Sequence, residues 1–575
     1  MIHREEAKSA KVVVKEAEGG GFASPFPASR SLFLRGSFLL PALLFLGIFF
    51  FYPLLRILAL SLDASVLTSE NLNRALYVLR FTLYQALLST LLTFLLGFPA
   101  AVLFARFDFR GKSLLRALTA IPFMLPTVVV AAGFNALLGP RGWLNLTLFP
   151  SSPVPFVGTL TAILIAHVFY NTTIVIRIVG NALTHLDPRL EQAARVLGAD
   201  SRRVWREVTL PLLRGPMLAA GLLVFLFDFA SFGVILLLGG PQFSTLEVEI
   251  YIQALQFLDL PMAALLSLIQ LSCTLIFSVL YSRVVTRASV PITPKPSIAR
   301  RPESLREKVF VASLLFLLSS FFILPLLSLP LRSLARLEAD RGERGAMQYG
   351  LTGDYYTELF INRRGSIFYV PPIEAARNSL VYAAATVGLS LVLGFPVAST
   401  LARPGRLERI LDPLLMLPLG ASAVTLGLGF IVAFNRLLAS PWLVPLAHTI
   451  IALPFVIRAL QPAIASIPDR LRHAAATLGA SHFRVWRTVD WPILSRAILA
   501  AATFAFTVSL GEFGAATLLT RPDNPTLPVA ISRFLSQPGG LNYGQAMAMS
   551  TILMLVTLIG ILLIEKLRLP GAGEF

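Results

Sequence analysis

Twelve long apolar runs, separated by shorter polar stretches, dominate the hydropathy pattern of the chain. Each run is close to the ~20 residues that an α-helix needs to cross a bilayer. The runs form two sets of six, at about 37–58, 81–105, 117–138, 158–179, 216–238 and 261–284, and at about 309–331, 379–402, 410–435, 443–463, 496–519 and 544–565. The pattern predicts an all-α, polytopic membrane protein with about 12 transmembrane helices.

Composition agrees with this class. Only 14% of the 575 residues are charged and the mean hydropathy is +0.74, so the chain has too little polar surface to cover a core in water. The net charge of +18 could indicate nucleic-acid binding, but in a membrane protein a basic excess marks cytoplasmic loops. No nucleic-acid partner is expected. Cys273 is the single cysteine, which excludes an internal disulfide and a cysteine-rich metal site.

Basic residues also indicate the orientation. They are enriched in the first 36 residues, in the loops after even-numbered spans and in the C-terminal tail. Because such residues stay on the cytoplasmic side, both termini are predicted to be cytoplasmic. The first apolar run has no cleavage pattern at its end, so it is expected to remain as an anchor.

The two sets of spans are copies of each other. Three pairs are 281 residues apart: Gly198 with Gly479, Trp205 with Trp486, and Pro211 with Pro492. Since six spans separate the copies, the halves have the same orientation in the membrane. The predicted organisation is a cytoplasmic tail (1–36), a first half (37–285), a cytoplasmic linker (286–308), a second half (309–566) and a C-terminal tail (567–575).

One repeated segment is polar and basic. It reads "EQAARVLGADSRRVWREVTLP" from Glu191 and "RHAAATLGASHFRVWRTVDWP" from Arg472. Asp187 followed by proline is a good helix start, and Gly198 fits a left-handed helix stop. A second helix is expected to end before Pro211. Each copy therefore predicts a helix–glycine–helix unit between two spans. Such a unit could lie on lipid headgroups, but its repetition in register favours a specific docking surface.

Here the chain resembles the permeases of ABC importers. In "EQAARVLG", Glu191, Ala193 and Gly198 are similar to that family's coupling-loop motif. In the second copy Ala474 and Gly479 are kept, but Arg472 replaces the glutamate. The resemblance implies a type I importer-like fold and places Trp205, Pro211, Trp486 and Pro492 in the two ATPase-docking loops. The change at Arg472 predicts two unequal docking interfaces.

The same resemblance implies the partners and the location. They are two ATP-binding cassette ATPase subunits, an extracytoplasmic solute-binding protein and the lipid of a bacterial cytoplasmic membrane. The sequence has no G-x(4)-G-K-[ST] phosphate loop. This chain is therefore expected to be no enzyme, with no catalytic residue and no cofactor of its own, and ATP and Mg²⁺ are expected on the ATPase.

The solute is less constrained by the sequence. Fused two-copy permeases of this kind resemble thiamine and ferric-iron importers, with anion permeases such as those for sulfate more distant. "DFASFGVILLLGGPQFSTLEVEIY", from Asp228, is most similar to thiamine permeases, so thiamine is preferred and ferric iron comes next. The long loop at about 332–377 could contact the binding protein or act as a spacer.

Two carboxylates fall within apolar runs. Asp228 and Glu512 lie in the fifth span of each half but not at equivalent positions, since Ser231 aligns with Glu512. Intramembrane acids are costly and face protein or water. They could line a translocation path for a cation, or they could be hydrogen-bonding groups that pack the two halves together. His167 and His448 are predicted to be interhelical hydrogen-bonding partners, and no metal site is predicted.

A gradient-driven secondary transporter with two six-helix halves is the alternative function. That class gives no reason for a docking segment after the fourth span of each half. The repeated helix–glycine–helix unit therefore favours the ABC importer.

Overall fold

The computed structural model describes residues 32–63, 65–149, 151–240, 242–288, 299–336, 350–362 and 370–567. Most of these residues are helical, and the only strands among them are β1 (Ala335–Arg336) and β2 (Gly350–Leu351). The all-α prediction is confirmed. The predicted tails, the linker and the 332–377 loop lie wholly or partly outside the described residues.

Within the described ranges, ten helices are long and apolar enough to cross a membrane. Short π- and 3-10-helical turns are labelled η; η1, η2 and η6 are π-helical, and η4 is a 3-10 turn. The long apolar helices are α2 (Leu32–Leu46) with η1 (Gly47–Phe51) and α3 (Tyr52–Ser61), α4 (Ser69–Arg106), α8 (Leu160–His185), α10 (Ser201–Val204) with η2 (Trp205–Thr209) and α11 (Leu210–Phe229), α14 (Leu260–Ala288), α15 (Leu305–Ser333), α17 (Pro372–Leu401), α20 (Leu443–Ala465), α22 (His482–Val485) with η6 (Trp486–Asp490) and α23 (Trp491–Gly511), and α26 (Gly540–Leu567).

The third span of each half is broken rather than straight. The pair Lys112–Met124 and Thr127–Leu148 bends by 110°, and the pair Arg406–Gly420 and Ala423–Ala433 bends by 97°. The chain reaches twelve spans only if each bent pair counts as one. At the first bend Leu125 is extended (ψ 147°), because a residue before proline is disfavoured in the helical region. The elements are α5 (Lys112–Met124), α6 (Thr127–Leu138) and α7 (Trp143–Leu148), and α18 (Arg406–Met416), η4 (Leu417–Gly420) and α19 (Ala423–Ala433).

The fifth spans end earlier than predicted. α11 ends at Phe229 and α23 at Gly511, and a short helix follows each break. The expected single spans at 216–238 and 496–519 were therefore wrong at their C-terminal ends. A second helix then precedes each sixth span, in a stretch read from sequence as a loop. The additional elements are α12 (Gly233–Leu238), α13 (Leu246–Leu255), α24 (Gly514–Leu519) and α25 (Leu527–Leu535).

The first helix of each half packs against the other half. α2 contacts α17 and α3 contacts α19, while α15 contacts α6. Phe49 lies 6.2 Å from Phe430, and Phe322 lies 5.3 Å from Phe169, measured between ring centroids. The first helix of each sequence repeat therefore packs against helices of the other repeat.

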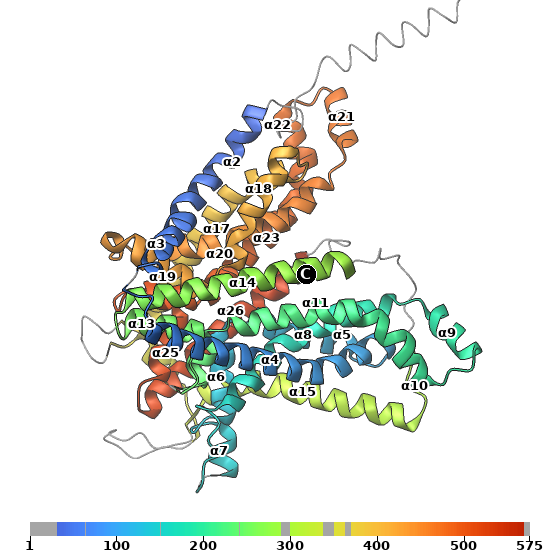
Figure 1. The fold of residues 1–575 in the computed structure, drawn as a ribbon, viewed down its shortest axis with the longest axis horizontal. Coiled ribbons are helices and arrows are strands. Elements are labelled where there is room, and N and C mark those ends of the chain that lie inside the picture. The colour runs from blue at the N-terminus through green and yellow to red at the C-terminus, as the bar shows by residue number, and fades with distance from the viewer. Residues whose placement is uncertain are drawn as a thin grey trace, which may run out of the picture.

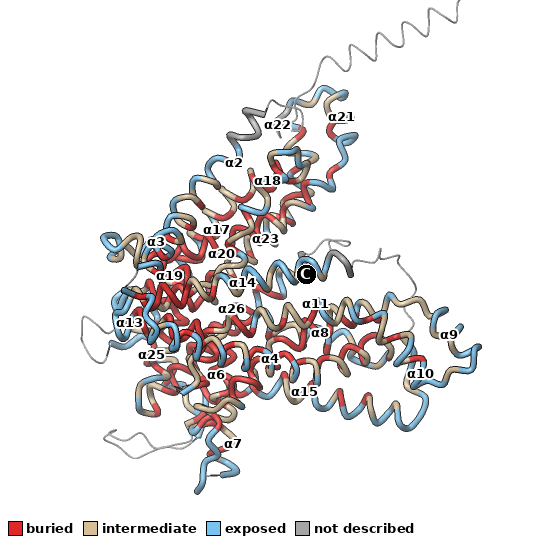
Figure 2. The backbone as a smooth tube through the Cα atoms, viewed as in Figure 1, coloured by how far each residue is buried: buried red, intermediate tan, exposed pale blue. Residues whose placement is uncertain are grey.

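Two arms of helices diverge from a shared base (Figure 1). α13, α19 and α25 lie near the base, and the helices after the fourth spans, α9 (Pro188–Val196) and α21 (Asp469–Thr477), lie at the far ends of different arms. Buried residues concentrate at the base and along helices such as α8 and α20 inside the arms, whereas helices such as α11, α14 and α15 are largely exposed (Figure 2). Many exposed residues are large and apolar, such as Leu95 and Phe316, as expected for helices that face lipid.

Candidate functional site

The first polar segment forms the predicted helix–glycine–helix unit from α9 and α10. The Asp187 carboxylate caps α9 by accepting a hydrogen bond from the Arg189 backbone N–H at 3.0 Å. α9 stops at Gly198, whose φ of +86° is the left-handed conformation that glycine adopts without a Cβ penalty. Ala199 N–H then bonds to the Ala194 carbonyl at 3.0 Å, as in a Schellman stop.

The second copy repeats this geometry in α21 and α22. Gly479 has φ +80°, and Ala480 N–H bonds to the Ala475 carbonyl at 3.1 Å. The two glycine stops are thus equivalent in sequence and in backbone conformation.

The sequence predicted that the second helix ends before Pro211, and this was wrong. In both units the second helix continues past the proline, Pro211 or Pro492. It continues through a π-helical turn, η2 or η6, into the fifth span. Leu210 N–H bonds to the Trp205 carbonyl five residues back. Such a wide turn accommodates the proline ring, which in a regular helix clashes with the carbonyl four residues earlier. Each polar unit is therefore continuous with a membrane-spanning helix.

The tips of both units are exposed. Leu197 and the equivalent Leu478 each expose 87% of their surface, and Ala193 and Ala474 are also exposed. We call these four residues the loop tips. Their small and apolar side chains present the same face to solvent in both copies.

The root of the first unit is held by Glu191. Its carboxylate pairs with Arg106, at the end of α4, and accepts a hydrogen bond from Thr209 Oγ1 at 2.8 Å. The Arg106 guanidinium also lies over the Trp205 ring, 4.6 Å from its centroid. Glu191 thereby connects α9 to the second span and to the start of the fifth.

The root of the second unit has the opposite polarity. Arg472 is 8% exposed, and its Nε donates to Asp490 Oδ1 at 2.8 Å. Its Nη1 donates to Asp469 Oδ1 at 3.3 Å, and Arg403, at the end of the second span, donates to the same oxygen at 2.6 Å. The hydrogen bond from Arg403 lowers the pKa of the Asp469 carboxyl below its ordinary value. The arginine at the position equivalent to Glu191 is therefore explained by its pairing with Asp469 and Asp490 within the chain.

The first intramembrane cluster surrounds His167 in α8. Its Nε2 lies 2.8 Å from Ser231 Oγ, and its Nδ1 lies 3.4 Å from Asp228 Oδ1. Asn171 Nδ2 donates to the same Asp228 oxygen at 2.7 Å. Asp228 has no exposed surface.

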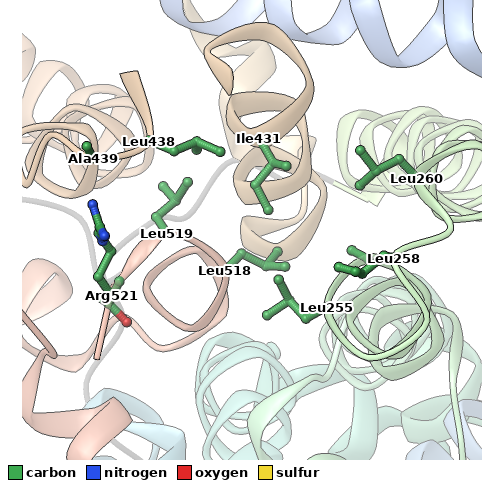
Figure 3. A pocket seen from close by; sticks show the side chains of 11 residues that line it. Leu255, Leu258, Leu260, Ile431, Leu438, Ala439, Leu518, Leu519 and Arg521 are labelled. Atoms are coloured by element: carbon green, nitrogen blue, oxygen red, sulfur yellow. The ribbon is translucent and has the colours of Figure 1, made fainter. Parts of the chain in front are cut away.

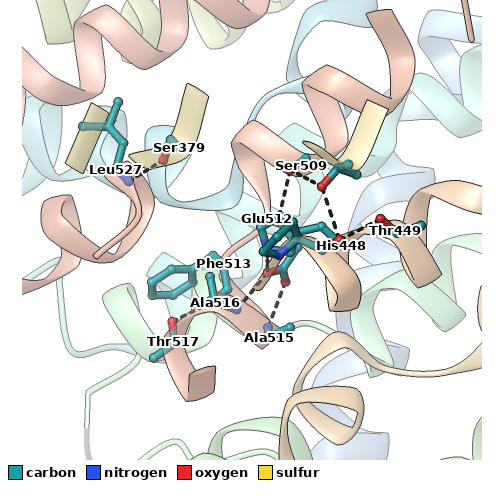
Figure 4. A network of polar contacts seen from close by, with 12 residues as sticks. Ser379, His448, Thr449, Ser509, Glu512, Phe513, Ala515, Ala516, Thr517 and Leu527 are labelled. Carbon is teal, nitrogen blue, oxygen red and sulfur yellow. Dashed lines mark hydrogen bonds and ion pairs between the residues drawn. The ribbon is translucent and has the colours of Figure 1, made fainter. Parts of the chain in front are cut away.

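The second cluster surrounds His448 in α20 (Figure 4). Its Nδ1 lies 2.8 Å from Ser509 Oγ, and its Nε2 lies 3.1 Å from Glu512 Oε2. Glu512 also accepts the backbone N–H groups of Ala515 and Ala516, both at 2.9 Å, at the start of α24. Both histidines are interhelical hydrogen-bonding partners, as predicted.

Acid and serine exchange places between the two clusters. Ser509 is equivalent to Asp228, as Ser231 is to Glu512, so each histidine faces one acid and one serine from its fifth span, in opposite order. His167 Nδ1 also lies 2.9 Å from Ser89 Oγ of α4. The bonds described for Asp228 and Glu512 lie within their own halves, and these do not join the halves. Phe232 and Phe513, which follow the clusters, stack at 5.5 Å between ring centroids and do meet across the interface.

Two buried acids in α13 were missed by the sequence analysis. Glu247 accepts a hydrogen bond from Ser422 Oγ at 2.6 Å, which joins α13 of the first half to the start of α19 in the second. Glu249 pairs with Arg74 at 2.8 Å. Two acids at alternate positions in an apolar stretch were an available signal. In the second half Pro528 stands where Glu247 stands in the first, so this contact occurs in one half only.

A cavity of about 380 Å³ lies between the halves (Figure 3). Leu255 and Leu258 line it from the first half, and Ile431, Leu518 and Arg521 line it from the second. Its walls are mainly apolar. Across the residues that the structure describes, no three His, Cys, Asp or Glu side chains are grouped so as to hold a metal ion.

Comparison with known proteins finds similarity along most of the chain. The family described as "Binding-protein-dependent transport system inner membrane component" matches it twice, at residues 94–290 and 390–567. The thiamine transport system permease protein ThiP of Brucella abortus (strain 2308) is 29% identical over 485 residues, which cover 82% of this chain and 85% of that protein. ThiP of Escherichia coli (strain K12) is 29% identical over 515 residues (86% and 89%). The probable ABC transporter permease protein y4fN of Sinorhizobium fredii (strain NBRC 101917 / NGR234) is 26% identical over 536 residues (91% and 93%).

Proposed function

Because the chain belongs to the family of binding-protein-dependent transport system inner membrane components, we propose that its two polar units dock the ATPase subunits of an ABC importer. The chain is a multi-pass permease with both copies of the repeat in one polypeptide. The family implies a solute-binding protein and an ATPase as partners, which supports an ABC importer over a gradient-driven transporter. One ATPase subunit on each unit gives two per chain.

The exposed loop tips carry this proposal. Leu197 and Leu478 occupy equivalent positions and are 87% exposed. An uncovered leucine forgoes roughly 1.5–3 kcal/mol of burial free energy. Scattered apolar residues are common on protein surfaces, but the same apolar face at two symmetric tips is typical of a protein contact. Ala193 and Ala474 beside them leave room for a close approach.

The continuous path from each unit into a span supports a mechanical role. A displacement of α10 or α22 is passed through η2 or η6 to the fifth span, because no loop separates these helices from the span, and α9 and α21 are joined to them by the short turns at Gly198 and Gly479. ATP and Mg²⁺ are bound by the partner ATPase. When its two subunits close, they draw the units together, and this movement switches the path from inward-open to outward-open.

The proposed orientation places both units and both termini in the cytoplasm of a bacterial cell. The basic residues of the loops after even-numbered spans support it. The solute-binding protein then delivers its cargo to the opposite face.

Thiamine is the solute that we propose, and ferric iron is the second candidate. The proposal draws on the relatives ThiP of Brucella abortus and Escherichia coli, whose names state thiamine transport. Purified binding protein from the same system can be titrated with each solute. Binding of ferric iron without binding of thiamine would reverse this preference.

Co-purification tests the docking. The wild-type chain is expressed with and without the ATPase, and the Gly198→Pro/Gly479→Pro variant is expected to lose association, because proline cannot adopt a positive φ. Gly111→Pro is the matched control: Gly111 also has a positive φ (+82°) and open space around it, but it lies outside the two units. Association that survives the double change, or that Gly111→Pro abolishes equally, contradicts docking through these units.

A further inference from the structure

We propose that Glu191 and Arg472 are positioning residues of two joints with opposite polarity, which transmit movement of the polar units to the membrane spans. The first joint is Arg106–Glu191–Thr209, and the second is Arg403–Asp469–Arg472–Asp490. This inference rests on the proposed docking of an ATPase, and it assigns the two residues to contacts within the chain instead of contacts with that partner.

The joints occupy equivalent places in the two halves. Thr209 and Asp490 are 281 residues apart, as are Glu191 and Arg472. Arg106 and Arg403 are 297 residues apart, which is the offset of the "GFP" stretches at Gly97 in α4 and Gly394 in α17; Arg403 lies just after the end of α17. The same two connections are therefore made in each half: from the unit to the end of the second span, and from the unit to the start of the fifth.

Charge balance explains the inversion. In the first joint one carboxylate, Glu191, makes both connections, to a guanidinium and to a hydroxyl. With an arginine at the central position, Arg403 needs its own carboxylate and Arg472 needs a second one. Asp469 and Asp490 supply them, and each joint remains neutral.

Burial separates the joints from the tips. Arg472 is 8% exposed and Asp490 is fully buried, whereas Leu478 on the same unit is 87% exposed. An ATPase that covers the tip meets the leucine, and the arginine lies beneath it against the fifth span. Docking and transmission are thus assigned to different residues of one unit.

The test uses the full chain with its ATPase and binding protein in membrane vesicles. Arg472→Glu sets a third carboxylate beside Asp469 and Asp490. It is expected to lower solute uptake per ATP hydrolysed by about tenfold, within the range of couplings between two sites, while co-purification of the ATPase is retained. Adding Asp490→Thr restores the glutamate, hydroxyl and guanidinium of the first joint and leaves Asp469 as its one additional carboxylate. Because the introduced carboxylate can accept from the introduced hydroxyl and pair with Arg403, about threefold or more of the lost coupling should return. Leu478→Ser is the opposite control and should lose co-purification.

Two results would overturn the proposal. One is loss of co-purification in Arg472→Glu, which would make Arg472 a docking contact. The other is a well-folded double variant that is no better than the single one. If Arg472→Glu does not fold, Asp490→Asn is tested in its place, because it keeps the shape of the side chain. It must reduce solute uptake per ATP hydrolysed more than Asp469→Asn does, since the Asp469 side chain is half exposed. A wild-type chain that never binds the ATPase would refute the docking function itself, which is a separate outcome.

Discussion

The two intramembrane acids differ in how many donors they accept, and this difference predicts unequal costs of neutralising them. Glu512 accepts two backbone N–H groups at the start of α24 and faces His448. In Glu512→Gln one oxygen becomes an amide nitrogen, so at least one buried N–H loses its acceptor. The loss is about 1–3 kcal/mol, and removal of the negative charge at a helix N-terminus adds about 0.3–1 kcal/mol. We expect a destabilisation of about 1–4 kcal/mol.

Asp228→Asn is the matched comparison in the other half. Asp228 Oδ1 accepts from Asn171, but Oδ2 has no hydrogen-bond partner within the described parts of the chain. Asparagine keeps the first acceptor and leaves no backbone N–H without its acceptor, so the cost should stay below about 1 kcal/mol.

Both variants can be purified in detergent and unfolded with increasing SDS, with helix content followed by circular dichroism. Gel filtration of each variant before titration controls for aggregation. A cost for Asp228→Asn that equals or exceeds that of Glu512→Gln would refute the reasoning, because the number of satisfied donors would then not set the cost.

Three further predictions concern single contacts. Gly198→Ala should destabilise the left-handed stop by about 1–2 kcal/mol and speed amide exchange in α9, measured by mass spectrometry; unchanged exchange would contradict it. Ser422→Ala removes the donor to Glu247 and should cost about 1–3 kcal/mol in the same SDS titration, so an unchanged midpoint would count against this contact between the halves. The hydrogen bond from Arg403 lowers the pKa of Asp469 in the folded protein below its ordinary value of 3.8. The pair therefore stabilises the fold above pH 3.8, and this stabilisation is lost as the pH falls from there through the lowered pKa. The stability gap to Asp469→Asn should therefore close below about pH 4, and a constant gap would refute the pairing.

Local features of the fold were predictable from the sequence. Run length identified the helices that can cross a membrane, and matched spacings identified the repeat. Asp187 and Gly198 marked the start and stop of a helix because caps and left-handed turns depend on a few adjacent residues. The continuation of each unit past Pro211 was not predictable in this way, since a π-helical turn can absorb a proline that would end a regular helix.

The partners of the polar residues were not predictable from one stretch of sequence. The change from Glu191 to Arg472 suggested unequal docking, whereas the structure pairs each residue inside its own half. Offset arithmetic alone could have aligned Asp490 with Thr209, but it could not show that either side chain reaches the central residue of the loop.

The sequence by itself determined which segments are apolar enough to cross a membrane, that they occur in two parallel copies, and that the first helix of each polar unit stops at a glycine. These properties follow from hydrophobic periodicity and from hydrogen bonds between near neighbours. Only the tertiary structure showed that the first helix of each half packs against the other half and that the third spans bend. It also showed that the acid and the serine beside His167 occupy the opposite positions beside His448. These arrangements depend on contacts between residues far apart in the chain, where packing and the satisfaction of buried polar groups select the partner.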